Sequence, residues 1–147
     1  MKSIPNELFF KEIENIISAG NEVELRVKGI SMLPYLRSNI DIVILSPLKI
    51  RELKKGQIVL FRYKGKHLLH RIIKINGEEL VIQGDGNFGR EEARISDIIG
   101  VVTAVIRSNG KKVSVERFQD QIYWKIWIAL RPARRYLLWG IKNFRQG

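Results

Sequence analysis

Residues 27–34 read VKGISMLP and join a predicted strand to a turn. Glu22 to Lys28 alternates apolar and charged side chains, which predicts a half-buried strand that ends at Gly29. Pro34 opposes continuation into a helix, so the chain is expected to turn within these residues. Ser31 is thereby placed at a strand end, where its hydroxyl can lie outside the sheet. A serine in this position is either an ordinary turn residue or a nucleophile.

Two later segments bear on that choice. His70-Arg71 lies in a strand predicted from His67 to Ile75. Residues 84–87, which read GDGN, form the turn after the next predicted strand. A serine nucleophile needs a base within hydrogen-bond reach and donors for the oxyanion. An imidazole titrates near neutral pH and therefore suits the role of base.

These segments resemble the serine peptidase superfamily of type I signal peptidases and self-cleaving repressors. The matching pieces come in family order over roughly residues 22–105: SMLP at 31–34, GQIVLF at 56–61, HR at 70–71 and GDGN at 84–87. A histidine at the base position is similar to the endoplasmic-reticulum, archaeal and sporulation-type branch. The resemblance implies a Ser-His endopeptidase with Ser31 as nucleophile and His70 as general base. We expect neither a cofactor nor a metal ion.

The acid that would orient His70 stays open between two residues. The resemblance implies Asp85, within GDGN, or Glu91, at a position where the family carries aspartate. Asp85 is alternatively only a cap of its turn. Gly29 departs from the family, because many signal peptidases carry a second serine there as oxyanion donor. Backbone N–H groups, including that of Ser31, would have to replace it.

The resemblance also implies where a substrate would bind. Family members bind an extended peptide beside the strand that leads to the nucleophile, here residues 22–29. We therefore expect contacts to the substrate around the nucleophile, from Gly29, Ile30, Met32 and Pro34.

Composition restricts the other classes of function. The 147 residues include no cysteine, which excludes disulfides and thiolate chemistry. A net charge of +11 favours an anionic partner, either a membrane surface or nucleic acid. Residues 1–20 carry three glutamates and no apolar core, so we expect no signal peptide. No apolar run reaches the roughly 18 residues of a spanning helix. We expect a cytoplasmic protein or one peripheral to the inner face of the membrane.

The chain divides into three predicted parts. Residues 1–21 form an amphipathic helix, residues 22–117 a signal-peptidase-like β domain, and residues 118–147 a basic, aromatic helical tail. Hairpin signals such as Asn76-Gly77 predict an antiparallel, mainly β fold in a single domain. Residues 85–96 are expected to be a polar loop.

The tail contains all three tryptophans, interleaved with arginines and lysines. Such a pattern is typical of a helix in a membrane interface. The expected interface residues are Trp124, Trp127, Arg131, Arg134, Arg135 and Trp139. The alternatives are a tail packed on the β domain and a segment that binds another partner.

The leading hypothesis is an endopeptidase that cleaves a leader or precursor peptide near an anionic membrane surface. The first alternative is a peptide-binding or accessory protein of the same fold with weak or no turnover. The second is a DNA-binding repressor, for which only the net charge speaks, because the tail shows no helix-turn-helix pattern.

Overall fold

The computed structural model describes residues 6–130 and 139–143. The chain begins with helix α1 (Asn6–Ser18) and ends its regular structure with helix α2 (Phe118–Ala129) and a short helical segment at 139–143. Between the helices the strands are β1 (Val23–Arg26), β2 (Ile42–Ser46), β3 (Ile58–Tyr63), β4 (Lys66–Asn76), β5 (Glu79–Gln83), β6 (Glu91–Arg94), β7 (Ile98–Ile106) and β8 (Lys112–Ser114). Two 3-10 turns, η1 (Ile50–Glu52) and η2 (Ile95–Asp97), precede β3 and β7.

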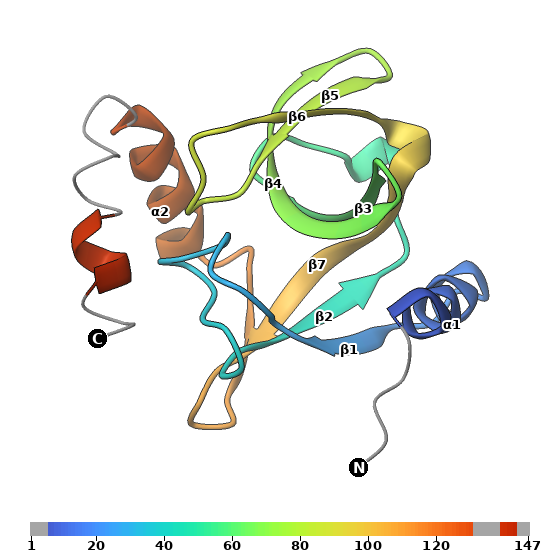
Figure 1. The fold of residues 1–147 in the computed structure, drawn as a ribbon, viewed down its shortest axis with the longest axis horizontal. Helices are drawn as coiled ribbons and strands as arrows, with labels where there is room; N and C mark the ends of the chain where they lie inside the picture. Colours follow the sequence, from blue (N-terminus) through green and yellow to red (C-terminus); the bar gives the residue numbers. More distant parts are fainter. Residues whose placement is uncertain (1–5, 131–138, 144–147) are drawn as a thin grey trace.

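The strands form one eight-stranded sheet in which every pairing is antiparallel. Its order is β1-β2-β7-β3-β4-β5-β6, with β8 paired to β7. The sheet curls, and α1 and α2 lie on opposite sides of it (Figure 1). The prediction of a mainly β protein with a helix at each end is therefore confirmed.

The core has two parts because the central strands are buried on both faces. Along β3, Ile58 and Leu60 pack into one cluster while Val59 and Phe61 pack into the other. Successive residues of a strand point to opposite faces, so a continuous apolar run serves two layers. Helix α1 covers the first cluster and lies so close to Gly100 of β7 that a Cβ there would be 2.9 Å from Ile17 Cδ1.

One expectation for the fold was wrong. Residues 85–96 are not a continuous loop, because Glu91–Arg94 form β6 and pair with β5 in the register Ile82↔Glu91. The segment reads EEAR and looks polar, yet Glu91 and Ala93 are buried while Glu92 and Arg94 are exposed. The alternation that defines a half-buried strand is present, with a carboxylate on the inner face.

No helix among the described residues combines the length and the apolar character needed to cross a bilayer.

Candidate active site

Ser31 lies in a loop whose two ends are tied together. Val27 N–H donates to the Asp41 carbonyl at 2.9 Å, and Asn39 N–H donates to the Val27 carbonyl at 2.8 Å. Gly29 has a φ of 79°, a backbone conformation that side chains with a Cβ rarely adopt, and its N–H donates to Ser38 Oγ at 2.9 Å. Residues 27–41 are therefore a closed unit, the serine loop, which contains Ser31.

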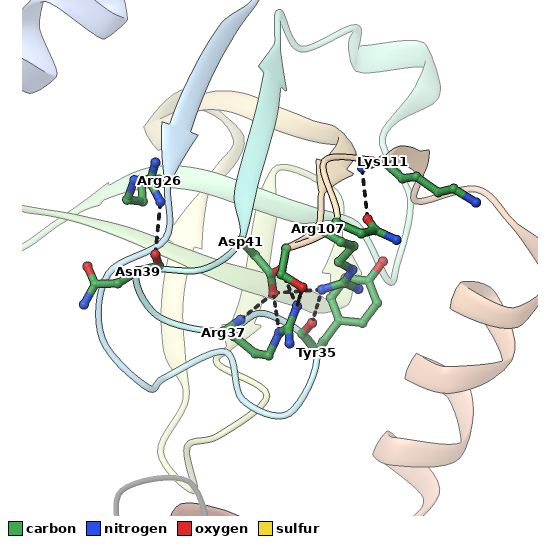
Figure 2. Close-up of polar contacts among 9 residues, drawn as sticks. Arg26, Tyr35, Arg37, Asn39, Asp41, Arg107 and Lys111 are labelled. Carbon is green, nitrogen blue, oxygen red and sulfur yellow. Dashed lines mark hydrogen bonds and ion pairs between the residues drawn. The ribbon is translucent and has the colours of Figure 1, made fainter.

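Asp41 holds the far end of this loop, as Figure 2 shows. Its carboxylate is fully buried and accepts the Arg37 backbone N–H at 2.7 Å. Arg107 of the segment after β7 donates from the same Nη1 to Asp41 Oδ2 at 2.9 Å and to the Tyr35 carbonyl at 2.7 Å (Figure 2). A buried charge is tolerated when it is paired and hydrogen-bonded in this way. The cluster fixes the loop to the sheet.

The GDGN turn between β5 and β6 packs on the near end of the loop. Gly86 N–H donates to the Ser31 carbonyl at 2.8 Å. Neither glycine of the turn has room for a side chain. A Cβ at Gly84 would lie 2.5 Å from the Ser31 carbonyl oxygen, and a Cβ at Gly86 would lie 2.6 Å from the Ile30 carbonyl oxygen. The same point at Gly84 is 3.0 Å from His70 Cδ2. The turn therefore brings the backbone of Ser31 and the ring of His70 to one place.

Glu91 is the carboxylate that contacts His70. Its Oε1 and the Nδ1 of the imidazole form a hydrogen-bonded pair, and both side chains are buried. This leaves Nε2 as the ring nitrogen for a second partner, the arrangement of a histidine that is oriented by an acid. Of the two acids that the sequence left open, the structure places Glu91, and not Asp85, in this contact.

Asp85 has a different partner. It binds Arg71 through two hydrogen bonds, Nε to Oδ1 at 2.9 Å and Nη2 to Oδ2 at 2.8 Å. The Arg71 guanidinium lies over the rings of Tyr35 and Tyr123, and its Nη1 donates to the Gly56 carbonyl at 2.9 Å. Burial alone would lower the pKa of Arg71, but the charge of Asp85 and its hydrogen bonds raise it above the ordinary value.

Helix α2 completes this arrangement from outside the sheet. Trp127 Nε1 donates to the Asp85 carbonyl at 2.8 Å, and Tyr123 Oη lies 3.3 Å from Asp85 Oδ2. Lys142, in the 139–143 segment, donates to the Gly86 carbonyl at 2.7 Å. These positioning contacts, and the role of Arg71 as the partner of Asp85, were not predicted from the sequence. The sequence signal for a buried ion pair was Arg71 itself, which directly precedes two isoleucines in the middle of β4. A cation that is buried in a strand requires an anion as partner.

The burial of α2 corrects part of the predicted membrane interface. Trp124 and Trp127 are both buried against the β domain, and Trp124 lies directly over Gly56, where a Cβ would be 2.3 Å from its ring. They face inward because residues three apart lie on one side of a helix. Trp139 is 72% exposed. The three predicted interface arginines, Arg131, Arg134 and Arg135, lie outside the described residues.

Ser31 and His70 line the same cavity of about 370 Å³. Its walls are the end of β1, residues 67–70 of β4, Met32 and the aromatic pair Phe9 and Phe10 of α1. Within residues 6–130 and 139–143, no hydrogen bond joins Ser31 Oγ to His70. Catalytic hydrogen bonds are often formed only when substrate is bound. The surface of the cavity is mainly apolar, and Ser31 and His70 are both part of its lining.

The backbone supplies the remaining polar groups. In the part of the chain that the structure describes, the N–H groups of Ser31 and Met32 donate no hydrogen bond. They are the available donors for an oxyanion, since Gly29 has no side chain to contribute.

The predicted substrate-binding residues do not all line the cavity. Met32 does, and its Sδ also accepts the Asp85 N–H at 3.4 Å. Pro34 lines a separate shallow recess with Arg37 and Arg107, Gly29 is exposed, and Ile30 packs its carbonyl against Gly86. The residues that line the cavity instead are Leu25 and Arg26 of β1 and the two that follow it, Val27 and Lys28.

The other histidine belongs to the wall of the cavity. His67 stacks on Phe10 with ring centroids 4.4 Å apart and lies 3.4 Å from Glu14 of α1. Larger recesses occur over β5 and β6 and beside η1, but neither includes Ser31 or His70. Among the described residues, no cluster of three His, Asp or Glu side chains is arranged to hold a metal ion.

Comparison with known proteins adds no assignment. No protein-family model matches the sequence, and no curated protein matches it either.

Proposed function

We propose that the protein is a serine endopeptidase of the signal-peptidase type that cleaves a leader or precursor peptide. The observation that carries the proposal is the contact of Glu91 with His70, a histidine that lines the same cavity as Ser31. A buried imidazole with a carboxylate on one nitrogen, together with a serine in the same cavity, is the set of groups that acyl transfer requires.

The proposed reaction uses Ser31 Oγ as nucleophile. His70 Nε2 removes its proton as Oγ attacks the scissile carbonyl carbon, and Glu91 holds the imidazolium that forms. The Ser31 and Met32 N–H groups stabilise the oxyanion of the tetrahedral intermediate. When this intermediate collapses, His70 gives the proton to the leaving amine and an acyl-serine remains. Water, activated by His70, then releases the carboxylate product and restores Ser31.

The sheet offers a place for an extended substrate. Among the described strands, β1 is at the end of the sheet and pairs only with β2, so its outer edge is available for a further strand. A peptide added at this edge would run past Leu25 to Lys28 and reach Ser31, with apolar side chains directed into the cavity.

A peptide-binding protein without turnover is the second candidate. It is favoured by one observation, the absence of a hydrogen bond between Ser31 Oγ and His70 in the described part of the chain. This candidate shares the cavity and the free edge of β1 with the peptidase, and differs only in the chemistry at Ser31.

The test is to incubate the full chain with a diverse peptide mixture and to identify cleavage products by mass spectrometry. We expect internal cleavage that is lost in both Ser31→Ala and His70→Ala. Ser96→Ala changes an exposed serine on η2 and should cleave like the unchanged chain. If no peptide is cleaved while some are retained by the folded protein, the binding protein becomes the better assignment. Cleavage that survives Ser31→Ala would refute the proposed nucleophile.

A further inference from the structure

The outer face of α2 carries a stripe of exposed apolar side chains that the proposed peptidase does not use. Four of them follow one another at intervals of four residues: Phe118, Ile122, Ile126 and Leu130. Phe118 is 78% and Ile126 53% exposed. Residues four apart lie on the same side of a helix, so the four form one continuous strip along its length.

This stripe is not required for packing within the domain. The inner face of α2 already supplies Trp124, Trp127 and Asp120, all of which are buried. Asp120 accepts from Tyr35 Oη at 2.6 Å and from Arg117 Nε at 2.7 Å, which fixes the first turn of the helix to the serine loop. An exposed strip of large apolar residues on a helix that is already docked indicates a partner for the other side.

The charge of the sequence that contains and follows the stripe indicates what that partner is. Residues 121–147 contain no aspartate or glutamate. The same segment contains six basic residues: Lys125, Arg131, Arg134, Arg135, Lys142 and Arg145. Lys125 is exposed within the helix itself. The stripe spans residues 118–130, whose single acid, Asp120, is buried on the inner face of α2. Exposed apolar side chains in a segment without an exposed acid match a bilayer with anionic lipids, which has an anionic surface above an apolar interior.

We propose that α2 docks through Phe118, Ile122, Ile126 and Leu130 on the surface of an anionic lipid bilayer. A nucleic acid would satisfy the basic residues but would leave the apolar strip in water. A second copy of the chain would bring two acid-free segments of the same sign together. The docking residues thus differ from Trp124 and Trp127, which the domain itself buries. The inference does not depend on Ser31 or on turnover.

The experiment measures sedimentation of the full chain with vesicles. One set contains equal parts of phosphatidylglycerol and phosphatidylcholine, and the other contains phosphatidylcholine alone. The test variant combines Ile122→Gln with Ile126→Gln. The control combines Leu8→Gln on α1 with Ile50→Gln on η1, two apolar residues outside α2 that are at least as exposed as the test residues. Circular dichroism and thermal unfolding verify that all proteins are folded.

We expect binding to the anionic vesicles, little binding to the neutral ones, and weakening of binding as salt is added. The test variant should bind at least about tenfold more weakly, because two side chains no longer enter the apolar layer, while the control should bind normally. Failure of the unchanged protein to bind would overturn the proposal. So would equal binding by the test variant, an equal loss in the control, or a dimer in solution that only the test variant dissociates.

A duplex DNA fragment provides the remaining comparison. Binding to DNA that exceeds binding to anionic vesicles and is unaffected by the Gln substitutions would assign the basic segment to nucleic acid and overturn lipid docking. Because the readout is sedimentation, loss of docking and absence of cleavage are separate results.

Discussion

At the scale of single residues, two buried acids contact two different basic side chains. His70 and Arg71 are neighbours on β4 and therefore point to opposite faces of the strand. Glu91, on the inner face of β6, contacts His70, whereas Asp85, in the turn before it, binds Arg71. The face of the strand, rather than distance along the chain, decides which acid serves which base.

This division makes Glu91 the acid on which turnover should depend. Glu91→Gln keeps the size of the side chain but removes the charge that would stabilise the imidazolium. We expect kcat for peptide cleavage to fall by about a hundredfold or more, with a small change in KM. Glu92→Gln on the exposed side of the same strand is the control and should retain activity. A fall in KM alone, or equal losses in both variants, would contradict the role of Glu91.

The choice between the acids was beyond sequence reasoning for a structural reason. Ser31 and His70 were predicted from motifs that keep their order along the chain. Asp85 and Glu91 are six positions apart, but only Glu91 lies on β6. Its side chain points inward because of the register in which β6 pairs with β5. A segment that reads EEAR has no apolar residue but Ala93, so its strand was not recognised.

At the scale of secondary structure, α2 acts as a brace for the turn that holds the site. Its Trp127 donates to the Asp85 carbonyl, and Gly86 of the same turn donates to the Ser31 carbonyl. The helix is therefore connected to the serine loop through the GDGN turn, in addition to the direct hydrogen bond from Tyr35 to Asp120. Its position relative to the sheet was not predictable from periodicity, because apolar residues occur on both of its faces.

Removing this brace should affect both stability and turnover. Trp127→Phe keeps an aromatic ring but loses the N–H donor to Asp85. We expect the free energy of unfolding to fall by about 1–3 kcal/mol, because a buried carbonyl loses its partner. We also expect a lower kcat for peptide cleavage. Trp139→Phe, at a 72% exposed position, is the matched control. Thermal unfolding and peptide cleavage measure the two effects, and indistinguishable behaviour of the two variants would show that α2 is not a brace.

At the scale of the whole molecule, Tyr35 links the serine loop to α2 and makes the assembly sensitive to alkali. Burial, followed by its hydrogen bond to Asp120, raises the pKa of the Tyr35 phenol above its ordinary value. The folded protein keeps this proton at a pH where the unfolded chain releases it. The contribution to stability is therefore complete below about pH 10, the ordinary tyrosine pKa, and is lost progressively above it.

We expect the free energy of unfolding to decrease above about pH 10 with a contribution from Tyr35 of up to about 1.4 kcal/mol per pH unit. Tyr35→Phe should lack this contribution and show a shallower alkaline slope. Tyr63→Phe, on β3 and without a contact to Asp120, should keep the slope of the unchanged chain. Denaturant unfolding at a series of pH values provides the measurement. Parallel slopes in all three proteins would exclude Tyr35 as the cause.

The order of strands has a consequence for the time before folding is complete. Ser31 follows β1, at one end of the sheet, and the turn that closes on it joins β5 to β6, at the other end (Figure 1). During synthesis, the ribosome exposes Ser31 and His70 before it has made residues 84–91. The proposed peptidase would therefore stay latent at least until residues 84–91 emerge, and its own polypeptide and its neighbours would not be cleaved in the meantime.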